Sequence, residues 1–419
     1  MKIKTVQTSY ENVDKLPFGE HISPKRQSSF LRWLIKEISK NELKKVDFSY
    51  EMIGRDKLAK SQPCLYLMNH SCFTDLMIAG SLIYPKPFHI VCTSDGFVGK
   101  GALMRKVGCI PTHKFVMDTT LVKDMLYVTK ELKSSVLMYP EASYSFDGTA
   151  TPLPDSIGKL IKMLKIPVVM IKTYGAFQRD PLYNNLQVRK SKITADVKLL
   201  LDVEDIANKG ADEILNIVKE EFSFDNFKWQ KDNGVIVDES FRADYLNRVL
   251  YKCSSCKTEG QMEGKGIYLT CKACGKKWEM KEDGSLQALD GMNEFSHIPD
   301  WYKWERDCVR AEIEEGSYKL EVPIKIGIIK DEKAVYMVGD GVLCHSKEGF
   351  HLTGCDGKLD YKQSVKASYS LYADYYWYEI GDMICIGDMK TLYYCFPQDS
   401  GDVVAKTRLA AEELYKMNG

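Results

Sequence analysis

Residues 64–75 read CLYLMNHSCFTD and join a short apolar run to a histidine and an aspartate. Residues 64–68 show no alternation of polar and apolar side chains, which is typical of a parallel strand covered on both faces. Apolar side chains return at helical spacing from residue 73 to residue 83. The stretch therefore predicts a strand, a loop and a helix, and it places His70 at the carboxyl end of the strand, where open α/β sheets bind ligands.

The spacing of His70 and Asp75 restricts how the two side chains can meet. Positions i and i+5 of one continuous helix point about 140° apart, so contact requires His70 in the loop and Asp75 in the first helical turn. Asp75 then accepts from one imidazole nitrogen and leaves the other as a base. A satisfied histidine–aspartate pair in a loop gives the same pattern, so the pair alone does not establish a catalytic dyad.

Three more segments follow in order along the chain: GCIPTHK at residues 108–114, LMYPEAS at 137–143 and IPVVMI at 166–171. With Asn69–Asp75 they resemble the four sequence blocks of the glycerolipid acyltransferase family, which includes the lysophosphatidate acyltransferases. The family patterns are Asn-His-x4-Asp, a Gly-x-Ile segment ending in Arg, Phe-Pro-Glu-Gly-Thr-Arg, and a Val-Pro-Ile-Val-Pro strand. The resemblance covers about residues 40–230, roughly half of the chain.

The resemblance implies an α/β acyltransferase domain with a mostly parallel sheet flanked by helices. The implied reaction moves a fatty acyl group from an acyl thioester, acyl-CoA or acyl carrier protein, to the hydroxyl of a lysophospholipid or related lipid acceptor. The implied site residues are His70 as general base, Asp75 as its orienting partner, Glu141 and Ser143 at the acceptor, Lys114 at the headgroup and Asn69 in the turn of the substrate site.

These residue types suit acyl transfer. A base must take the acceptor's proton as its oxygen attacks the thioester carbonyl, and neutral imidazole serves this purpose at about pH 7. The leaving thiolate needs little help, because thiol pKa values lie near about 8.5. The developing oxyanion calls for backbone N–H donors, which we expect from the turn at residues 69–71.

The chain departs from the family pattern at the charged positions of two blocks. Lys114 stands where the second block has arginine, and Tyr144 stands where the third block has its arginine. The resemblance associates both arginines with the phosphate of the acceptor. Lysine lacks the bidentate guanidinium fork and tyrosine brings no charge. We therefore expect acceptors with larger or less charged headgroups than lysophosphatidate.

Two other interpretations remain open. Cys72, beside His70, can be a nucleophile that forms an acyl-enzyme in a thioesterase, or a small buried apolar residue. The altered third block also allows an acyltransferase fold that has lost catalysis and acts as a lipid- or protein-binding module. Turnover of a thioester by the wild-type chain distinguishes that module from an enzyme.

Four cysteines form two pairs, Cys253-x2-Cys256 and Cys271-x2-Cys274, separated by fourteen residues. This spacing is close to that of four-thiolate zinc sites, and hairpin strands are expected on either side of the second pair. The pattern resembles a zinc ribbon with a structural Zn²⁺, because four protein ligands leave no open coordination position. Redox-active dithiols are the alternative.

The chain divides into three expected domains. Residues 1–240 hold the acyltransferase domain with an amino-terminal amphipathic segment, and residues 241–290 hold the zinc ribbon. Residues 300–419 form a β-barrel-like domain of pleckstrin-homology type, closed by a helix at 402–417. Its expected strands are 322–329, 334–338, 342–345, 349–353, 363–367, 370–378, 383–387 and 391–396.

Composition limits the partners and the location. Lysine plus arginine and aspartate plus glutamate are equal at 58 each, which argues against nucleic acid as a partner. No signal-peptide pattern and no apolar run of about 18 residues is present. Phe30, Leu31, Leu34, Ile35 and Ile38 share one helical face, which either lies on a membrane surface or packs on the enzyme. We expect a cytoplasmic protein, peripheral on the inner face of the membrane.

Overall fold

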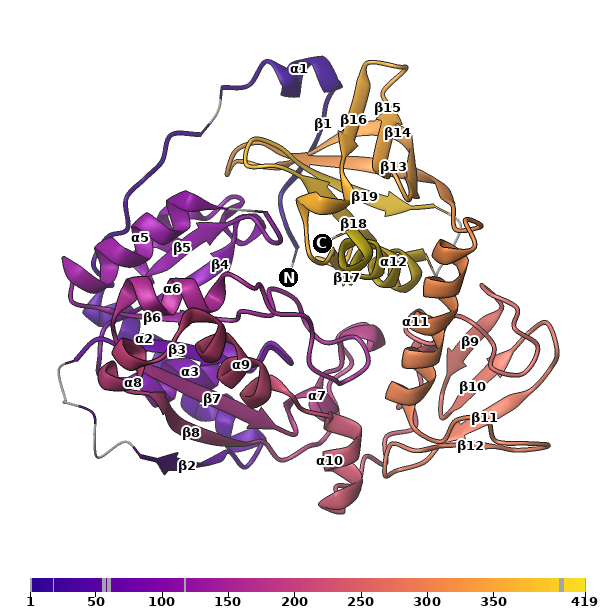
Figure 1. Cartoon of the computed structure of the whole chain (residues 1–419), viewed down its shortest axis with the longest axis horizontal. Coiled ribbons are helices and arrows are strands. Elements are labelled where there is room, and N and C mark those ends of the chain that lie inside the picture. Colours follow the sequence, from indigo (N-terminus) through magenta and orange to yellow (C-terminus); the bar gives the residue numbers. More distant parts are fainter. Residues whose placement is uncertain are drawn as a thin grey trace.

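The computed structural model describes residues 2–17, 19–54, 58, 62–116, 118–398 and 403–418. Within them the chain builds three sheets. Figure 1 shows a seven-stranded sheet with its helices on one side of the molecule and two antiparallel sheets on the other, with helix α11 between the latter two.

The seven-stranded sheet has the order β2-β8-β7-β3-β6-β4-β5. All its neighbouring strands are parallel except β7 and β8. The predicted strand at residues 64–68 is present as β3 at the centre, and all four of its residues are buried. The strands are β2 (Ser49–Ile53), β3 (Leu65–Met68), β4 (Phe88–Thr93), β5 (Cys109–Thr112), β6 (Ser135–Met138), β7 (Val168–Tyr174) and β8 (Thr194–Leu201).

Helices cover both faces of this sheet, because alternate residues of β3 enter different cores. Tyr66 and Met68 share one core with Ile78 of α3, whereas Leu65 and Leu67 share the other with helices α5, α6 and α9. The mostly parallel α/β domain is therefore confirmed. The helices of this half are α2 (Ser29–Lys45), α3 (Asp75–Ile83), α4 (Gly101–Lys106), α5 (Thr119–Lys130), α6 (Ile157–Leu164), α7 (Ala176–Arg179), α8 (Val203–Asn208), α9 (Ala211–Phe222) and α10 (Asn226–Asp232). Helix α1 (Tyr10–Asp14) lies beside the carboxyl-terminal sheet (Figure 1), and its buried Val13 belongs to the core of that sheet.

A small four-stranded antiparallel sheet follows, in the order β12-β11-β10-β9. Its buried Trp278 meets Trp301 of helix α11 (Ile298–Glu314), with ring centroids 5.0 Å apart. The helix therefore completes the core of this sheet. Its strands are β9 (Met262–Lys265), β10 (Tyr268–Cys271), β11 (Lys277–Met280) and β12 (Leu286–Ala288).

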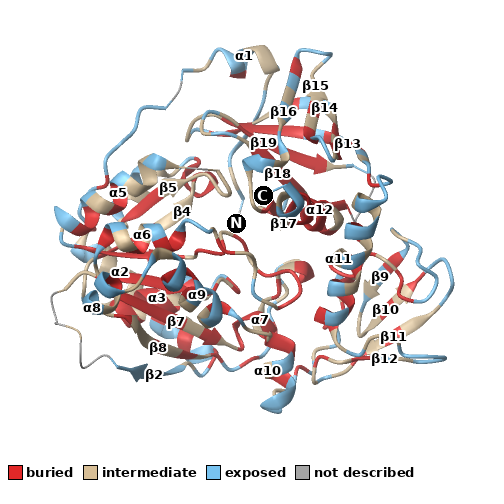
Figure 2. Ribbon diagram, in the orientation of Figure 1, coloured by how far each residue is buried: buried red, intermediate tan, exposed pale blue. Residues whose placement is uncertain are grey.

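The carboxyl-terminal sheet has the antiparallel order β16-β15-β14-β13-β19-β18-β17, followed in the chain by helix α12 (Val403–Asn418). Figure 2 shows α12 buried over much of its length, as the central strands are. The strands are β13 (Leu320–Ile329), β14 (Val335–Ser346), β15 (Gly349–Gly354), β16 (Leu359–Gln363), β17 (Tyr372–Trp377), β18 (Gly381–Gly387) and β19 (Leu392–Pro397).

Two strand predictions in this region are wrong. The separate strands at 334–338 and 342–345 are one strand, β14, because the chain continues through Gly339 in an irregular register instead of turning there. The strand at 363–367 is not formed, since β16 ends at Gln363 and Val365–Ala367 is a 3-10 turn. The predicted start of the last helix at Asp402 lies outside the described residues.

The amino-terminal strand of the described chain pairs with the carboxyl-terminal sheet. Strand β1 (Thr5–Gln7) pairs in parallel with β14, from Thr5 opposite Val335 to Gln7 opposite Met337. A three-residue strand carries no local pattern that identifies such a distant partner. None of the helices in the described parts of the chain is both long and apolar enough to cross a membrane.

Candidate active site and candidate metal centre

His70 lies in the loop between β3 and α3, and Asp75 is the first residue of α3. The imidazole Nδ1 is 3.1 Å from Asp75 Oδ2, and the Asp75 side chain is fully buried. This is the loop-and-first-turn arrangement that the spacing predicts. Because Nδ1 is the nitrogen that Asp75 engages, Nε2 is the nitrogen left for a substrate hydroxyl.

The carboxylate of Asp75 also fixes the backbone of the loop. Its Oδ2 accepts from the N–H groups of Ser71 at 2.7 Å and Cys72 at 3.1 Å. The N–H of His70 donates to Glu141 Oε2 at 3.0 Å. The amides of His70 and Ser71 are therefore bound by carboxylates and are not the oxyanion donors that the sequence predicts. Buried carboxylates are strong acceptors for such N–H groups.

Asn69 ties this loop to the end of the neighbouring strand β7. Its Oδ1 accepts from the N–H of Thr173 at 2.8 Å, and its Nδ2 donates to the carbonyl of Thr173 at 3.1 Å. The pairing imitates a strand-to-strand contact just beyond the last residue of β3. Asn69 thereby shapes the turn that presents His70.

Glu141 has protein partners on both carboxylate oxygens. Oε2 accepts from His70 N–H, and Oε1 accepts from the N–H of Thr151 at 2.9 Å and from its hydroxyl at 3.2 Å. Burial raises the pKa of Glu141 to about 7, against the opposing effect of these donors. The side chain thus connects the third sequence block to the backbone of the catalytic histidine.

Two tyrosines that the sequence does not assign to the site enclose the His70 ring. The ring centroids of Tyr139 and Tyr144 lie 4.2 and 4.0 Å from that of His70, and both are stacked on it. Burial lowers the pKa of His70, and the Asp75 carboxylate opposes this shift. The imidazole is therefore neutral at neutral pH, while 18% of the side chain stays exposed.

The loop that carries Tyr144 is held by a residue from the end of the chain. Arg408 of α12 donates to Ser143 Oγ at 3.1 Å and to the Tyr144 carbonyl at 3.4 Å. Ser143 Oγ itself donates to the Tyr144 carbonyl at 3.0 Å. Ser143 is thus engaged by the protein, and Arg408 joins the site without any local sequence signal, because their contact spans 265 positions.

Lys114 follows β5 and lies against the carboxyl-terminal sheet. Its Nζ is 4.0 Å from the ring centroid of Tyr372 in β17. Its positive charge also contributes to the lowered pKa of His70. Lys114 therefore contacts the carboxyl-terminal sheet and acts electrostatically on His70.

Cys72 is buried beside the catalytic pair, with Sγ 3.9 Å from Asp75 Oδ1. Burial raises the pKa of its thiol well above the ordinary value, and the negative charge of Asp75 adds to the shift. A thiolate nucleophile is therefore disfavoured at this position.

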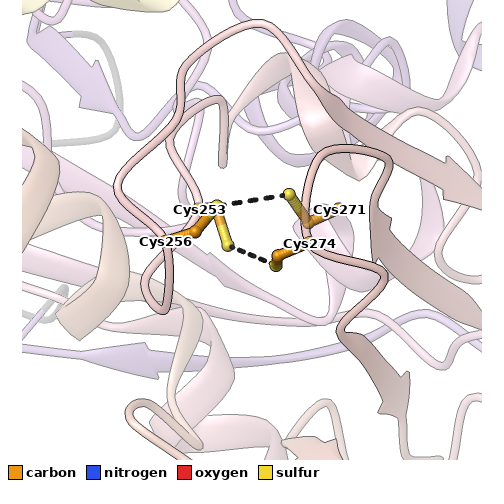
Figure 3. A group of neighbouring side chains, drawn as sticks. All are labelled: Cys253, Cys256, Cys271 and Cys274. Carbon is orange, nitrogen blue, oxygen red and sulfur yellow. Dashed lines mark hydrogen bonds between the residues drawn. The ribbon is translucent and has the colours of Figure 1, made fainter.

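The four paired cysteines come together in the small sheet (Figure 3), with all four sulfurs within 4.8 Å of one another. Cys253 Sγ lies 3.8 Å from Cys274 Sγ, and Cys256 Sγ lies 3.7 Å from Cys271 Sγ. Tetrahedral zinc with Zn–S bonds of about 2.3 Å requires sulfurs about 3.8 Å apart. The donor set and its spacing are compatible with a bound metal ion.

Comparison with known proteins agrees with the site. Residues 49–172 match the family model described as Acyltransferase. A search of curated proteins found no match. Among solved structures, the chain resembles the 1-acyl-sn-glycerophosphate (LPA) acyltransferase PlsC from Thermotoga maritima, with 12% identity over 46% of this chain and 77% of that chain and a TM-score of 0.38. The residues that resemble this family include His70, Asp75, Lys114 and Glu141.

Proposed function

We propose that this protein is an O-acyltransferase that moves a fatty acyl group from acyl-CoA or acyl carrier protein to the hydroxyl of a lysophospholipid or related lipid. The observation that carries the proposal is the buried His70–Asp75 pair at the carboxyl end of β3, inside the residues that match the acyltransferase family.

In the proposed reaction, Nε2 of His70 takes the proton of the acceptor hydroxyl as its oxygen attacks the thioester carbonyl. Asp75 holds the imidazole through Nδ1 and stabilises the imidazolium that forms. The tetrahedral intermediate then expels the thiolate, which takes up the proton from His70. Asn69 and Glu141 position the histidine through its backbone.

The acceptor is proposed to carry a larger or less charged headgroup than lysophosphatidate. The Tyr144 ring stacks on His70 and carries no charge. Of the two arginine positions in the family pattern, only Lys114 is therefore basic in this chain. A lysine acts on an anion as a point charge without a bidentate fork. Lysophosphatidate outcompeting all other acceptors in a mixed-substrate assay would contradict this part of the proposal.

Contact with a membrane surface is proposed for helix α2. Phe30, Trp33 and Ile38 have 64%, 46% and 56% of their surface exposed, and Arg26 beside them is also exposed. Leu31, Leu34 and Ile35 are half-buried and Leu43 is buried. Ile35 lies against Gly80 of α3, where an added Cβ would be 3.1 Å from Ile35 Cγ2. One side of α2 thus packs on the enzyme, and exposed aromatic side chains remain for the lipid headgroup layer.

The cysteine cluster is proposed to hold a structural Zn²⁺. Four thiolates fill a tetrahedral shell, so the ion would stabilise the small sheet and take no part in acyl transfer.

Incubation of the purified full chain with acyl-CoA or acyl carrier protein thioesters and a panel of lysolipids, followed by mass spectrometry, tests the function. New acylated lipid supports the proposal. Thioester hydrolysis without acyl transfer would favour the thioesterase interpretation, and lipid binding without turnover would favour a binding module.

A further inference from the structure

A cavity of about 530 Å³ lies between the loop after β5 and the carboxyl-terminal sheet. Cavities of this volume are in the usual range for small-molecule sites, about 300–1,000 Å³. Lys114, Phe115 and Val116 supply its wall from the acyltransferase domain. The remaining lining residues come from the segments 361–372 and 385–392, so neither half of the chain forms the cavity alone.

The cavity has apolar walls and a surplus of positive charge. Leu371, Ile386 and Leu392 are buried in its lining. The charged lining residues are three lysines, Lys114, Lys362 and Lys390, and one carboxylate, Asp388.

The carboxylate offsets at most one of the three positive charges. Asp388 Oδ1 accepts from the backbone N–H groups of Lys390 at 2.7 Å and Thr391 at 3.0 Å, which fixes the turn between β18 and β19. Within the described parts of the chain, none of the three lysines forms an ion pair with a carboxylate. Their charge is therefore available to an anionic group that enters the cavity.

We propose that this cavity binds a phosphate-bearing group of a substrate, with Lys114, Lys362 and Lys390 as its charged contacts. The inference rests on the proposed acyl transfer for the identity of the substrate. A phosphate can come from the nucleotide end of coenzyme A or from the headgroup of the acceptor. In both cases the carboxyl-terminal sheet is part of the substrate site.

The position of Lys114 connects the cavity to the chemistry. Lys114 lines the cavity with its Nζ over the Tyr372 ring, and its charge acts on His70. A phosphate held beside Lys114 would place its substrate against a residue that follows β5 of the seven-stranded sheet. The apolar wall accommodates carbon atoms next to the phosphate, which a site for a free inorganic ion does not need.

Binding of two small probes to the full chain tests the inference without requiring turnover. Adenosine 3′,5′-bisphosphate represents the nucleotide end of coenzyme A, and sn-glycero-3-phosphocholine represents the larger headgroup of the proposed acceptor. We expect one of them to bind in isothermal titration calorimetry, with an affinity that falls as salt is added. The probe that binds identifies the source of the phosphate.

The variant Lys362→Gln/Lys390→Gln keeps polar, unbranched side chains and removes two charges. We expect its Kd for the bound probe to rise about tenfold or more, while Lys366→Gln leaves Kd unchanged. Lys366 is an exposed lysine of the same segment that does not line the cavity. Thermal unfolding verifies that the variants are folded.

Failure of both probes to bind the wild-type chain, or wild-type affinity in the double variant, overturns the inference. Probe binding that depends on Lys362 and Lys390, in a protein that transfers no acyl group, supports the cavity as a phosphate site and contradicts the proposed function alone. The two failures are therefore distinguishable.

Discussion

At the scale of single residues, His70 combines two properties that a general base needs. Asp75 orients the ring from a fully buried position, and burial between Tyr139 and Tyr144 lowers the pKa of the imidazole. The neutral form therefore predominates where the reaction takes place. Asp75 also holds the backbone of the loop, so its removal disturbs both the ring and the turn.

Substitution of the pair separates the proposed mechanism from the thiol alternative. We expect His70→Ala and Asp75→Asn to lower kcat by about 10²–10⁴-fold, because general-base catalysis contributes this much. Cys72→Ser should keep most of the activity, since its thiol is buried and protonated. Steady-state kinetics with an acyl thioester measure the effect, and circular dichroism shows whether each variant is folded. Full activity of folded His70→Ala would refute the mechanism.

The pH dependence of the reaction tests whether Lys114 acts on the histidine. Activity requires neutral His70 and is lost as pH falls through its pKa, which burial places below the usual value of about 6.5. Lys114→Ala removes a positive charge that disfavours the imidazolium, so the pKa of His70 rises and the acid limb of kcat/KM moves to higher pH. Lys130→Ala, on the surface of α5, is the control. Identical acid limbs for Lys114→Ala and the wild type would exclude this influence.

The sequence predicts the geometry of the catalytic pair because helix periodicity allows only one way for His70 and Asp75 to meet. It does not predict the stacked tyrosines. Tyr144 occupies an arginine position of the family pattern. The sequence shows that this position has lost its charge, but it does not show that the tyrosine ring contacts His70. Arg408 carries no signal at all, since its contact with Ser143 depends on how two distant segments pack.

At the scale of elements, the cysteine cluster joins the segment before β9 to the turn between β10 and β11 in a sheet that is small by itself. Replacing any one of the four cysteines by serine should abolish stoichiometric zinc binding and unfold β9–β12 first. Structural zinc contributes on the order of 10 kcal/mol to such modules. Elemental analysis of the purified protein measures the metal, and limited proteolysis locates the unfolded region. Zinc-free wild-type protein prepared without chelators would contradict the proposal, and Cys308→Ser, outside the cluster, is the control.

Helix α2 exposes large aromatic side chains to solvent, which suits a contact with a membrane surface. We expect Phe30→Ser/Trp33→Ser to weaken binding to vesicles that contain anionic lipid, because burial of apolar surface in the headgroup layer is lost. Tyr127→Ser is the matched control, since Tyr127 is 41% exposed on helix α5. Co-sedimentation with vesicles measures binding. Equal sedimentation of the double variant and the wild type would exclude α2 as the contact.

At the scale of the whole molecule, the carboxyl-terminal sheet is packed against the acyltransferase domain at several points. Tyr372 and Trp377 both donate to Asp95 Oδ2, at 2.7 and 3.1 Å, and Arg105 pairs with Glu332. The chain order alone predicts three domains in series. It cannot predict these contacts, because each depends on residues more than two hundred positions apart.

Arg408 provides the sharpest test of this packing. Arg408→Ala leaves Glu412 with one fewer cationic partner in a buried site and releases the Tyr144 loop. We expect a loss of about 3 kcal/mol in the free energy of unfolding, together with reduced kcat. Arg310→Ala is the control, because Arg310 is 45% exposed in its pair with Glu413 and should cost about 1 kcal/mol or less. Urea denaturation and steady-state kinetics measure both effects, and an unchanged kcat in Arg408→Ala would show that the loop does not need this residue.

The parallel pairing of β1 with β14 also affects the order in which parts of the chain can fold during translation. Val335 is translated 330 residues after Thr5, which corresponds to a delay on the order of tens of seconds at typical elongation rates. During this time the nascent seven-stranded sheet can form. Strand β1 cannot pair and the Tyr144 loop cannot be held, because β14 and Arg408 have not yet been translated. We therefore expect catalytic competence to appear only after Arg408 has left the ribosome, so that shorter nascent chains do not consume acyl thioester.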